Sequence, residues 1–147
     1  MIKPYLMFNR ECKEAFDLYQ QAFNGKIIAM QKYGDMPPNP EFPVAENDKE
    51  LVLHAELQIM ESGSIMGAAG KRDSKADGIV CISVNLESED RANSAWNILK
   101  EGGTIQYDLK PTFFAKLHGS IKDKYGVTWM FTVEWRNSCG MGEMIID

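Results

Sequence analysis

The stretch LVLHAELQI, residues 51–59, decides the fold of this chain because its side chains alternate strictly in polarity. Successive side chains of a β-strand point to opposite faces of a sheet, so a strand here has one apolar and one polar face. The apolar face, predicted to pack beneath a helix, consists of Leu51, Leu53, Ala55, Leu57 and Ile59. The polar face carries His54, Glu56 and Gln58 and is predicted to point away from that helix.

The segments around this stretch predict a small sheet with one helix. A strand over 2–9, a helix over 10–23 and a strand over 26–33 precede it, and a strand over 64–69 follows it. Asn9 is the predicted N-cap of the helix, and the Asn-Gly pair at 24–25 is its predicted stop. The helix has an apolar stripe at three- and four-residue steps, formed by Cys12, Ala15, Phe16, Tyr19 and Phe23.

A long irregular segment, residues 34–50, separates the second and third of these strands and contains four of the six prolines of the chain. Loops of this length inside a compact domain are usually functional or disordered. Residues 32–38 are therefore interpreted either as a lid over a site or as a plain surface loop.

The second half of the chain repeats the order of elements. It contains a predicted strand over 79–87, a helix that Ser88 caps, and strands over 104–109, 113–123 and 127–135. The apolar face of its first strand consists of Val80, Ile82, Val84 and Leu86, and the helical stripe consists of Ala92, Ala95, Trp96 and Leu99. A shift of 77 residues places Ala15 on Ala92 and Gly25 on Gly102, as expected for an internal repeat.

The predicted fold is therefore α+β, with two βαβββ modules in one domain, residues 1–135. Module one is residues 1–70, a linker spans 71–77, module two is residues 78–135, and 136–147 form a tail. Each helix covers one face of its sheet, and the opposite face stays open. If the two sheets curl toward each other, the open faces line a cleft. The residues expected there are Tyr5, His54, Glu56, Gln58, Met66, Met130 and the stretch 112–118.

Composition narrows the function classes. The chain has 147 residues, of which 44% are hydrophobic and 25% charged, with a net charge of -5. The scattered Lys and Arg argue against a nucleic-acid or anionic-membrane surface. No apolar run approaches the roughly 20 residues that span a bilayer, no secretion signal is recognisable, and the three cysteines lack a paired spacing. We therefore expect a cytoplasmic protein with reduced thiols that binds neither nucleic acid nor membranes.

An ordered set of short motifs resembles a known family. The motifs are PYLMFN, EAFDLYQQAFNGKI, DMPP, HAELQI, SIMG, ISVNLES and DKYGVTWMF, and they cover roughly residues 2–133. Together they resemble the PhnB-like branch of the vicinal oxygen chelate superfamily, the superfamily of glyoxalase I, bleomycin-resistance proteins and extradiol dioxygenases. The resemblance implies paired βαβββ modules that form a cupped mixed sheet, usually as a homodimer. Some relatives are described as 3-demethylubiquinone-9 3-methyltransferase.

The resemblance also implies where a metal would bind in this superfamily. Metal-using members place His or Gln on the first strand and Glu on the last strand of each module. The corresponding positions are Pro4 or Tyr5 and a residue near Ile79 on the first strands, and Met66 or Gly67 and Met130 on the last strands. None of these supplies the imidazole or carboxylate that Zn, Ni, Fe or Mn prefers. No cofactor is therefore expected, and no glyoxalase or dioxygenase activity is implied.

The polar face of residues 51–59 admits three interpretations. In the first, His54 and Glu56 form a hydrogen-bonded pair on a partly hydrated sheet face. In the second, they line a small-molecule pocket and orient a polar ligand, or act as an acid/base couple in which Glu56 tunes His54. In the third interpretation they hold a relocated divalent metal together with His118, which lies on the matching strand of module two.

The stretch 112–118 is the other candidate for ligand binding. Phe113 and Phe114 are predicted either to stack on a planar ligand, with Lys116 meeting its charge, or to be core or interface aromatics. The methyltransferase description finds little support, since S-adenosylmethionine is commonly held by a glycine-rich turn from strand to helix. The glycines of EGGTI, residues 101–105, instead follow a helix.

Three functional hypotheses follow. The leading one is a metal-free small-molecule binding protein whose cleft is lined by the residues named above. The second is an enzyme that uses His54 and Glu56 for acid/base or relocated-metal chemistry on a small polar substrate. The third is an interaction module whose cleft is filled by side chains or by the partner subunit of a homodimer.

Overall fold

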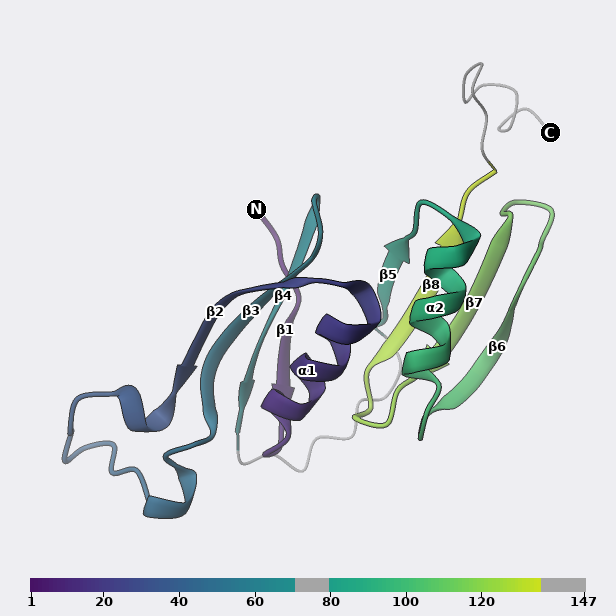
Figure 1. Cartoon of the computed structure of the whole chain (residues 1–147). Coiled ribbons are helices and arrows are strands. Elements are labelled where there is room, and N and C mark those ends of the chain that lie inside the picture. The colour runs from purple at the N-terminus through teal and green to yellow at the C-terminus, as the bar shows by residue number, and fades with distance from the viewer. Residues whose placement is uncertain (71–79, 136–147) are drawn as a thin grey trace. The chain divides into compact units, whose positions relative to one another are not determined.

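The computed structural model describes residues 1–70 and 80–135 (Figure 1). The chain divides into two compact units, Met1–Lys75 and Ala76–Asp147, and each is described here by itself. Module one lies in the first unit and module two in the second. The predicted linker 71–77 and tail 136–147 lie outside the described residues.

The two modules have the same topology, which confirms the predicted repeat. In module one the elements are β1 (Tyr5–Phe8), α1 (Cys12–Phe23), β2 (Lys26–Lys32), β3 (Val52–Met60) and β4 (Gly63–Ala69). In module two they are β5 (Ile82–Asn85), α2 (Glu89–Leu99), β6 (Thr104–Lys110), β7 (Leu117–Lys122) and β8 (Thr128–Val133). The strand orders are β1-β4-β3-β2 and β5-β8-β7-β6. In each sheet the first two strands of that order run parallel and the other neighbours antiparallel. The α+β fold class is confirmed.

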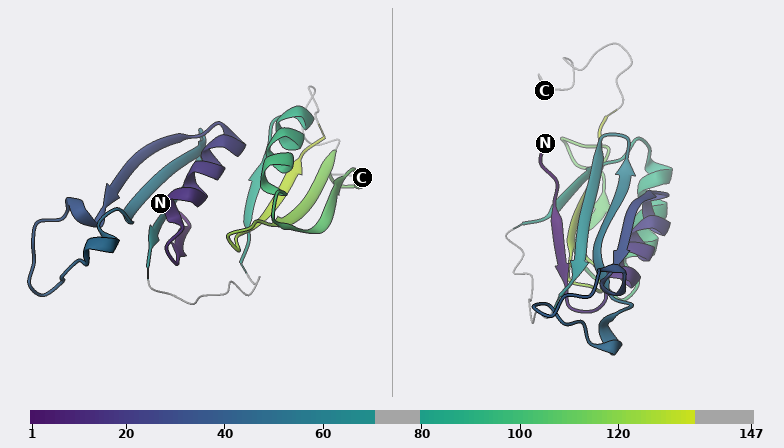
Figure 2. Two further views of the ribbon diagram at one scale, coloured as in Figure 1. Left: turned by 60° about the horizontal axis from the view of Figure 1, so that its bottom comes forward. Right: turned by 90° about the vertical axis from the view of Figure 1, so that its left-hand side faces the viewer.

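Each helix packs on one face of its own sheet, α1 on β3 and β4 and α2 on β8 (Figures 1 and 2). Both predicted apolar stripes are buried. The Ser88 Oγ accepts a hydrogen bond from the Arg91 backbone N–H at 3.2 Å, so the predicted cap of α2 is confirmed. Burial of these stripes is the main contribution of the helices to stability.

The start of α1 differs from the prediction. The helix begins at Cys12 after Glu11, and Asn9 is not its N-cap. Asn9 and Arg10 form a bend instead, where the Arg10 side chain is held by Asp48 at 2.7 Å. The predicted stop is confirmed, because Asn24 adopts a left-handed conformation with φ of 51°.

Strand β3 does not keep the strict alternation of its sequence. Ala55, Leu57 and Ile59 are buried as predicted, but Leu51 and Leu53 are only half-buried and Val52 is buried instead. The reason is a β-bulge. Gln31 of β2 pairs with His54 whereas Lys32 pairs with Val52, so Leu53 is the extra residue and the alternation reverses there.

Strand β5 is shorter than predicted. It runs from Ile82 to Asn85 because only these residues pair with β8. Val84 and Leu86 are buried, whereas Val80 precedes the strand and is exposed, so its predicted place on the apolar face was wrong.

A glycine beneath each helix allows close packing of a large aromatic side chain. A Cβ on Gly67 of β4 would lie 2.8 Å from Cε1 of Phe16, and one on Gly119 of β7 would lie 3.0 Å from Cη2 of Trp96. Ala55 pairs with Gly67 in module one, and Gly119 pairs with Phe131 in module two. The glycine therefore sits on the last strand in module one and on the third strand in module two.

Candidate functional site

The open face of module one brings together the predicted residues of three strands. Strand register places Tyr5, Met66 and Glu56 side by side in one row across β1, β4 and β3. His54 and Gln58 flank Glu56 on the same face of β3. These are the predicted ligand-binding residues of module one, and Tyr5 is the most open of them, with 45% of its surface exposed.

Tyr5 and His54 form a close pair on this face. The Tyr5 Oη lies 3.1 Å from Nδ1 of His54, within hydrogen-bonding distance. The two rings are also stacked, with centroids 5.8 Å apart and an interplanar angle of 27°. The pair thus presents two adjoining aromatic rings and a shared proton position on the open face.

Glu56 is held by lysine rather than by histidine. Its Oε2 accepts a hydrogen bond from Lys3 Nζ at 2.5 Å. This bond, helped by the charge of Lys3, a hydrogen bond from Ser64 and the nearby His54, lowers the pKa of the Glu56 carboxyl below its usual 4.5 despite opposing desolvation. Within the described ranges, the hydrogen bonds of His54 and Glu56 go to these other partners, and a direct bond between the two is not observed. Glu56 is a fixed carboxylate at neutral pH.

The Lys3–Glu56 ion pair predicts a pH-dependent contribution to stability. Because the folded-state pKa of Glu56 is lowered, the contribution is present above about pH 4.5 and is lost as the pH falls through the folded pKa. We expect Glu56→Gln to be less stable than wild type at pH 7, with a smaller difference at pH 3, in urea unfolding followed by circular dichroism. Glu61 is an exposed acid at the β3–β4 turn, and Glu61→Gln is the control. Its stability difference from wild type should be the same at pH 7 and pH 3. A Glu56→Gln difference that is equal at both pH values would contradict the assignment.

The open face of module two has the same framework with different chemistry. Ser83, Met130 and Ser120 form the row that corresponds to Tyr5, Met66 and Glu56. His118, two residues before Ser120, therefore occupies the position of His54, as the predicted match of their strands requires. The first-strand position was predicted near Ile79, which lies outside the described residues, and Ser83 is the residue of β5 that pairs with Met130.

The metal positions that the resemblance implies, Pro4 or Tyr5 with Met66 or Gly67 in module one, can be compared with the register of the strands. Register pairs Tyr5 with Met66 in module one and Ser83 with Met130 in module two. A phenol, a hydroxyl and two thioethers do not fit the imidazole and carboxylate set of a Zn, Ni, Fe or Mn centre. Across residues 1–70 and 80–135, no group of three His, Cys, Asp or Glu side chains is arranged to hold a metal ion.

Four aromatic side chains and a lysine form an open cluster on module two. The ring of His118 packs edge-on against Phe114 at 5.0 Å and against Tyr107 at 6.0 Å, and Phe113 packs against Phe114 at 5.3 Å. The Lys110 ammonium lies 5.2 Å from the Tyr107 ring centre. We call these five residues the aromatic cluster. Phe113 is 94% exposed and Phe114 52%, which is unusual for large apolar side chains.

One prediction about the stretch 112–118 needs correction. Phe113 and Phe114 were expected in a strand, but β7 begins at Leu117. Thr112 Oγ1 accepts hydrogen bonds from the backbone N–H groups of Phe114 and Ala115, which turns the chain there. Lys116, predicted to meet the charge of a ligand, has its Nζ 3.6 Å from Glu89 at the start of α2, and its predicted role stays a prediction. Lys110 and Tyr107, which sequence reasoning missed, are the residues that join the aromatic side chains.

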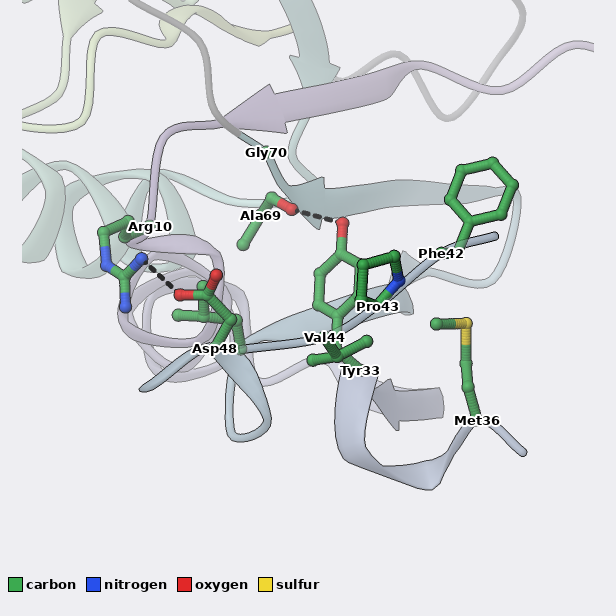
Figure 3. Close-up of a pocket in the computed structure, with 10 residues that line it drawn as sticks. Arg10, Tyr33, Met36, Phe42, Pro43, Val44, Asp48, Ala69 and Gly70 are labelled. Atoms are coloured by element: carbon green, nitrogen blue, oxygen red, sulfur yellow. Dashed lines mark hydrogen bonds and ion pairs between the residues drawn. The ribbon is translucent and has the colours of Figure 1, made fainter. Parts of the chain in front are cut away.

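A pocket of about 220 Å³ lies against the long loop of module one (Figure 3). Its lining residues are Arg10, Tyr33, Met36, Phe42, Pro43, Val44, Asp48, Leu51, Ala69 and Gly70. None of these was a predicted site residue. The sequence indicated this pocket only through the length and proline content of residues 34–50. These features did not show which side chains point into the pocket.

Hydrogen bonds join the two ends of the loop to each other and attach the loop to the rest of module one. The Tyr33 and Gly34 backbone N–H groups donate to the carbonyls of Leu51 and Lys49 at 3.0 and 2.9 Å. The Tyr33 hydroxyl donates to the Ala69 carbonyl at 2.9 Å, and Arg10 donates to the Asp48 carboxylate at 2.7 Å. We call residues 33–51 the proline loop. In module two the corresponding connection, 111–116, is much shorter.

Two other features bear on chemistry. Burial raises the pKa of the Cys12 thiol to about 12, so this cysteine is not a thiolate nucleophile. Gly102 follows α2 with φ of 73°, so the glycines of residues 101–105 end a helix as predicted. In the described part of the chain, no helix is long and apolar enough to cross a membrane.

Comparison with known proteins identifies relatives over nearly the whole chain. Residues 1–132 match the family described as 3-demethylubiquinone-9 3-methyltransferase. The chain is 29% identical to protein YjdN of Escherichia coli over 143 residues, which covers 90% of this chain and 94% of that protein. The crystal structure of PA1353 from Pseudomonas aeruginosa is similar with 35% identity and a TM-score of 0.78, covering 91% of this chain and 97% of that one. The PhnB protein from Bacillus cereus shares the fold with 24% identity and a TM-score of 0.73, over 90% and 98% of the two chains.

Proposed function

This chain belongs to the family described as 3-demethylubiquinone-9 3-methyltransferase, and on that premise we propose that it binds a planar small molecule on an open sheet face without a resident metal ion. The resemblance to PhnB-like proteins of the vicinal oxygen chelate superfamily, which the family match supports, sets the class of protein. Methyl transfer is not part of the proposal. The glycines of residues 101–105 end helix α2 and do not form a turn from strand to helix.

The observation that carries the proposal is the aromatic cluster. Apolar aromatic side chains exposed together commonly mark a binding surface, because their burial against a ligand removes them from water. Phe113 and Phe114 offer faces and edges for stacking, and Lys110 beside Tyr107 offers a positive charge for a polar substituent. His118, held by Thr132 at 3.3 Å, adds a hydrogen-bonding group.

The open face of module one supports the same class of ligand. His54 occupies the position of His118, and it also lies beside an exposed aromatic ring, that of Tyr5. Lys3 and Glu56 add one charge of each sign next to this pair. The side chains at the superfamily's metal positions favour contact with an organic ligand over coordination of a hard ion.

The test uses the fluorescent probe anilinonaphthalene sulfonate, an aromatic anion with a planar naphthalene ring. We expect saturable binding to wild type, and about 2- to 10-fold weaker binding to the double variant Phe113→Ala/Phe114→Ala, because an aromatic contact contributes roughly 0.5–1.5 kcal/mol. Both side chains are exposed, so the variant should fold. Phe42→Ala removes an exposed phenylalanine from module one and is the matched control. Equal affinities of wild type and the double variant would contradict a site at the aromatic cluster.

Metal ions provide the second arm of this test. Thermal melts with added Zn²⁺, Ni²⁺, Mn²⁺ or Fe²⁺ should leave the melting temperature of wild type unchanged. A rise in melting temperature that His54→Ala abolishes would overturn the metal-free proposal and favour the relocated metal centre.

One observation favours an enzyme as the second candidate. The 3.1 Å contact between Tyr5 Oη and His54 Nδ1 joins two groups that can exchange a proton. An acid/base couple on this face would therefore consist of Tyr5 and His54, with Glu56 kept as a carboxylate by Lys3. The homodimer and the filled-cleft interaction module stay predictions from sequence.

A further inference from the structure

The pocket beneath the proline loop has the character of a second small-molecule site, separate from the open sheet faces. Its walls are mainly apolar, with Met36, Phe42, Val44 and Leu51 around a volume of about 220 Å³. Ligand sites in proteins are typically concave and apolar with a few polar groups that orient the ligand. The polar groups here come from Tyr33, Arg10, Asp48 and the Ala69 carbonyl.

The pocket is held open by covalent and hydrogen-bonded restraints. Four prolines, at positions 37, 38, 40 and 43, restrict the backbone of the proline loop. The backbone hydrogen bonds of Tyr33 and Gly34 join its two ends to each other, and those of the Tyr33 hydroxyl and of Arg10 attach it to β4 and to the β1–α1 bend. A wall that is already ordered loses little conformational freedom when a ligand binds.

Phe42 is the residue that the fold itself leaves unexplained. It is 70% exposed although it is large and apolar, and it lies with Met36 at the end of the pocket opposite Arg10, with Tyr33 between (Figure 3). A ligand in the pocket would cover part of its ring. The Met36 side chain is flexible and polarizable, so it adapts to ligands of different shape.

The loop around the pocket is acidic, whereas the two charged side chains that line the pocket, Arg10 and Asp48, pair with each other. Five of the six charged residues of the proline loop are acidic, namely Asp35, Glu41, Glu46, Asp48 and Glu50 against Lys49. Asp48 lines the pocket, and its Oδ1 accepts from Arg10, which leaves Oδ2 as a further acceptor. The faces of Phe42 and Tyr33 attract positive charge, and the Ala69 carbonyl is a hydrogen-bond acceptor.

We propose that this pocket binds a small organic cation, an amine with an apolar or aromatic body. The body occupies the space between Met36, Phe42 and Val44. The ammonium group lies toward Asp48, where it donates hydrogen bonds to the carboxylate. Arg10 acts as a positioning residue that holds Asp48 in place through the β1–α1 bend.

The test compares two probes of the same shape and opposite charge, phenethylamine and phenylpropionate. In nitrogen–proton NMR titrations of the full chain, phenethylamine should shift the amides of the proline loop and of Ala69 and Gly70. Phenylpropionate should bind at least about tenfold more weakly, as a difference of one charge-assisted hydrogen bond predicts. Shifts confined to other residues, or equal binding of the two probes, would overturn the proposal.

Variants locate the cation within the pocket. Phe42→Ala should weaken phenethylamine about 2- to 10-fold through the lost ring contact, and its exposure means that folding is unaffected. Asp48→Asn should weaken it about tenfold. Glu46→Gln is the matched control, because it removes an acid of the same loop that is paired with Lys49 at 3.0 Å and does not line the pocket. If Glu46→Gln weakens binding as much as Asp48→Asn, only the general charge of the loop acts and a specific site is excluded.

The two proposals can be contradicted separately. If both hold, Phe42→Ala weakens the binding of phenethylamine but does not change the binding of anilinonaphthalene sulfonate at the aromatic cluster. The reverse pattern is expected for Phe113→Ala/Phe114→Ala. A single variant that abolishes both responses would show that the two probes share one surface and would overturn the second site.

Discussion

Replacing Asp123 by alanine is expected to lower the free energy of unfolding of module two by about 3 kcal/mol. Asp123 is 3% exposed and closes the β7–β8 turn. Its Oδ1 accepts from the backbone N–H groups of Tyr125 and Val127 at 2.8 and 3.1 Å, and its Oδ2 accepts from Nε1 of Trp129 at 2.9 Å. Alanine would remove the carboxylate that accepts from the indole N–H of the fully buried Trp129, which is the most costly part of the change.

Urea unfolding followed by tryptophan fluorescence measures this loss directly. All three tryptophans, Trp96, Trp129 and Trp135, belong to the unit Ala76–Asp147, so the signal reports on that unit. Asp108→Ala is the matched control, since it removes the same charge from an exposed position of β6 and should change stability by less than about 0.5 kcal/mol. Equal midpoints for the two variants would refute the role assigned to Asp123.

Replacing Gly119 by alanine should destabilise module two by about 1–3 kcal/mol, through overpacking. The added Cβ would lie 2.8 Å from Cα and 2.9 Å from the backbone nitrogen of Leu109. It would also lie 3.0 Å from the Trp96 ring. Two of these three contacts are with backbone atoms of the neighbouring strand, which cannot move away as a flexible side chain could. The expected result is a shift of β6 or α2 away from β7.

Gly63→Ala is the control for this change. Gly63 is also a strand residue, the first of β4. A Cβ at this position would meet only the Met60 side chain, at 3.9 Å, which is an ordinary contact. We expect the free energy of unfolding of Gly63→Ala to lie within about 0.5 kcal/mol of the wild-type value, measured by urea unfolding followed by circular dichroism. If Gly119→Ala is equally harmless, the close approach of β7 to Leu109 and Trp96 does not limit the packing of this module.

Most of the fold was predictable because its signals are local. The stripe of Ala92, Ala95, Trp96 and Leu99 and the cap at Ser88 specify a helix through contacts within one or two turns. The repeated order of elements then restricted the topology, since two segments with the same pattern fold in the same way. Where local signals were weak, as at Asn9, the boundary was wrong by two residues, because Arg10 is drawn to Asp48 in a distant loop.

The open face of module one was predictable in most of its residues but not in their pairing. Alternation correctly put His54 and Glu56 on one face of β3, and the matched strands correctly related His54 to His118. Glu56 pairs with Lys3 and His54 with Tyr5 because β1 lies parallel to β4 in this register. The sequence of β3 does not encode that register. Phe114 similarly reaches His118 only because Thr112 turns the chain before β7.

The sequence by itself determined the α+β class, the two βαβββ modules, the helical stripes and the face on which His54 and Glu56 lie. These features follow from the periods of the helix and the strand, which are properties of neighbouring residues. Only the tertiary structure decided that Val52 replaces Leu53 in the core, that Lys3 pairs with Glu56, and that the proline loop lines a pocket. Each of these depends on a register, an ion pair or a loop closure between residues far apart in the chain, and such contacts have no periodic pattern in the sequence.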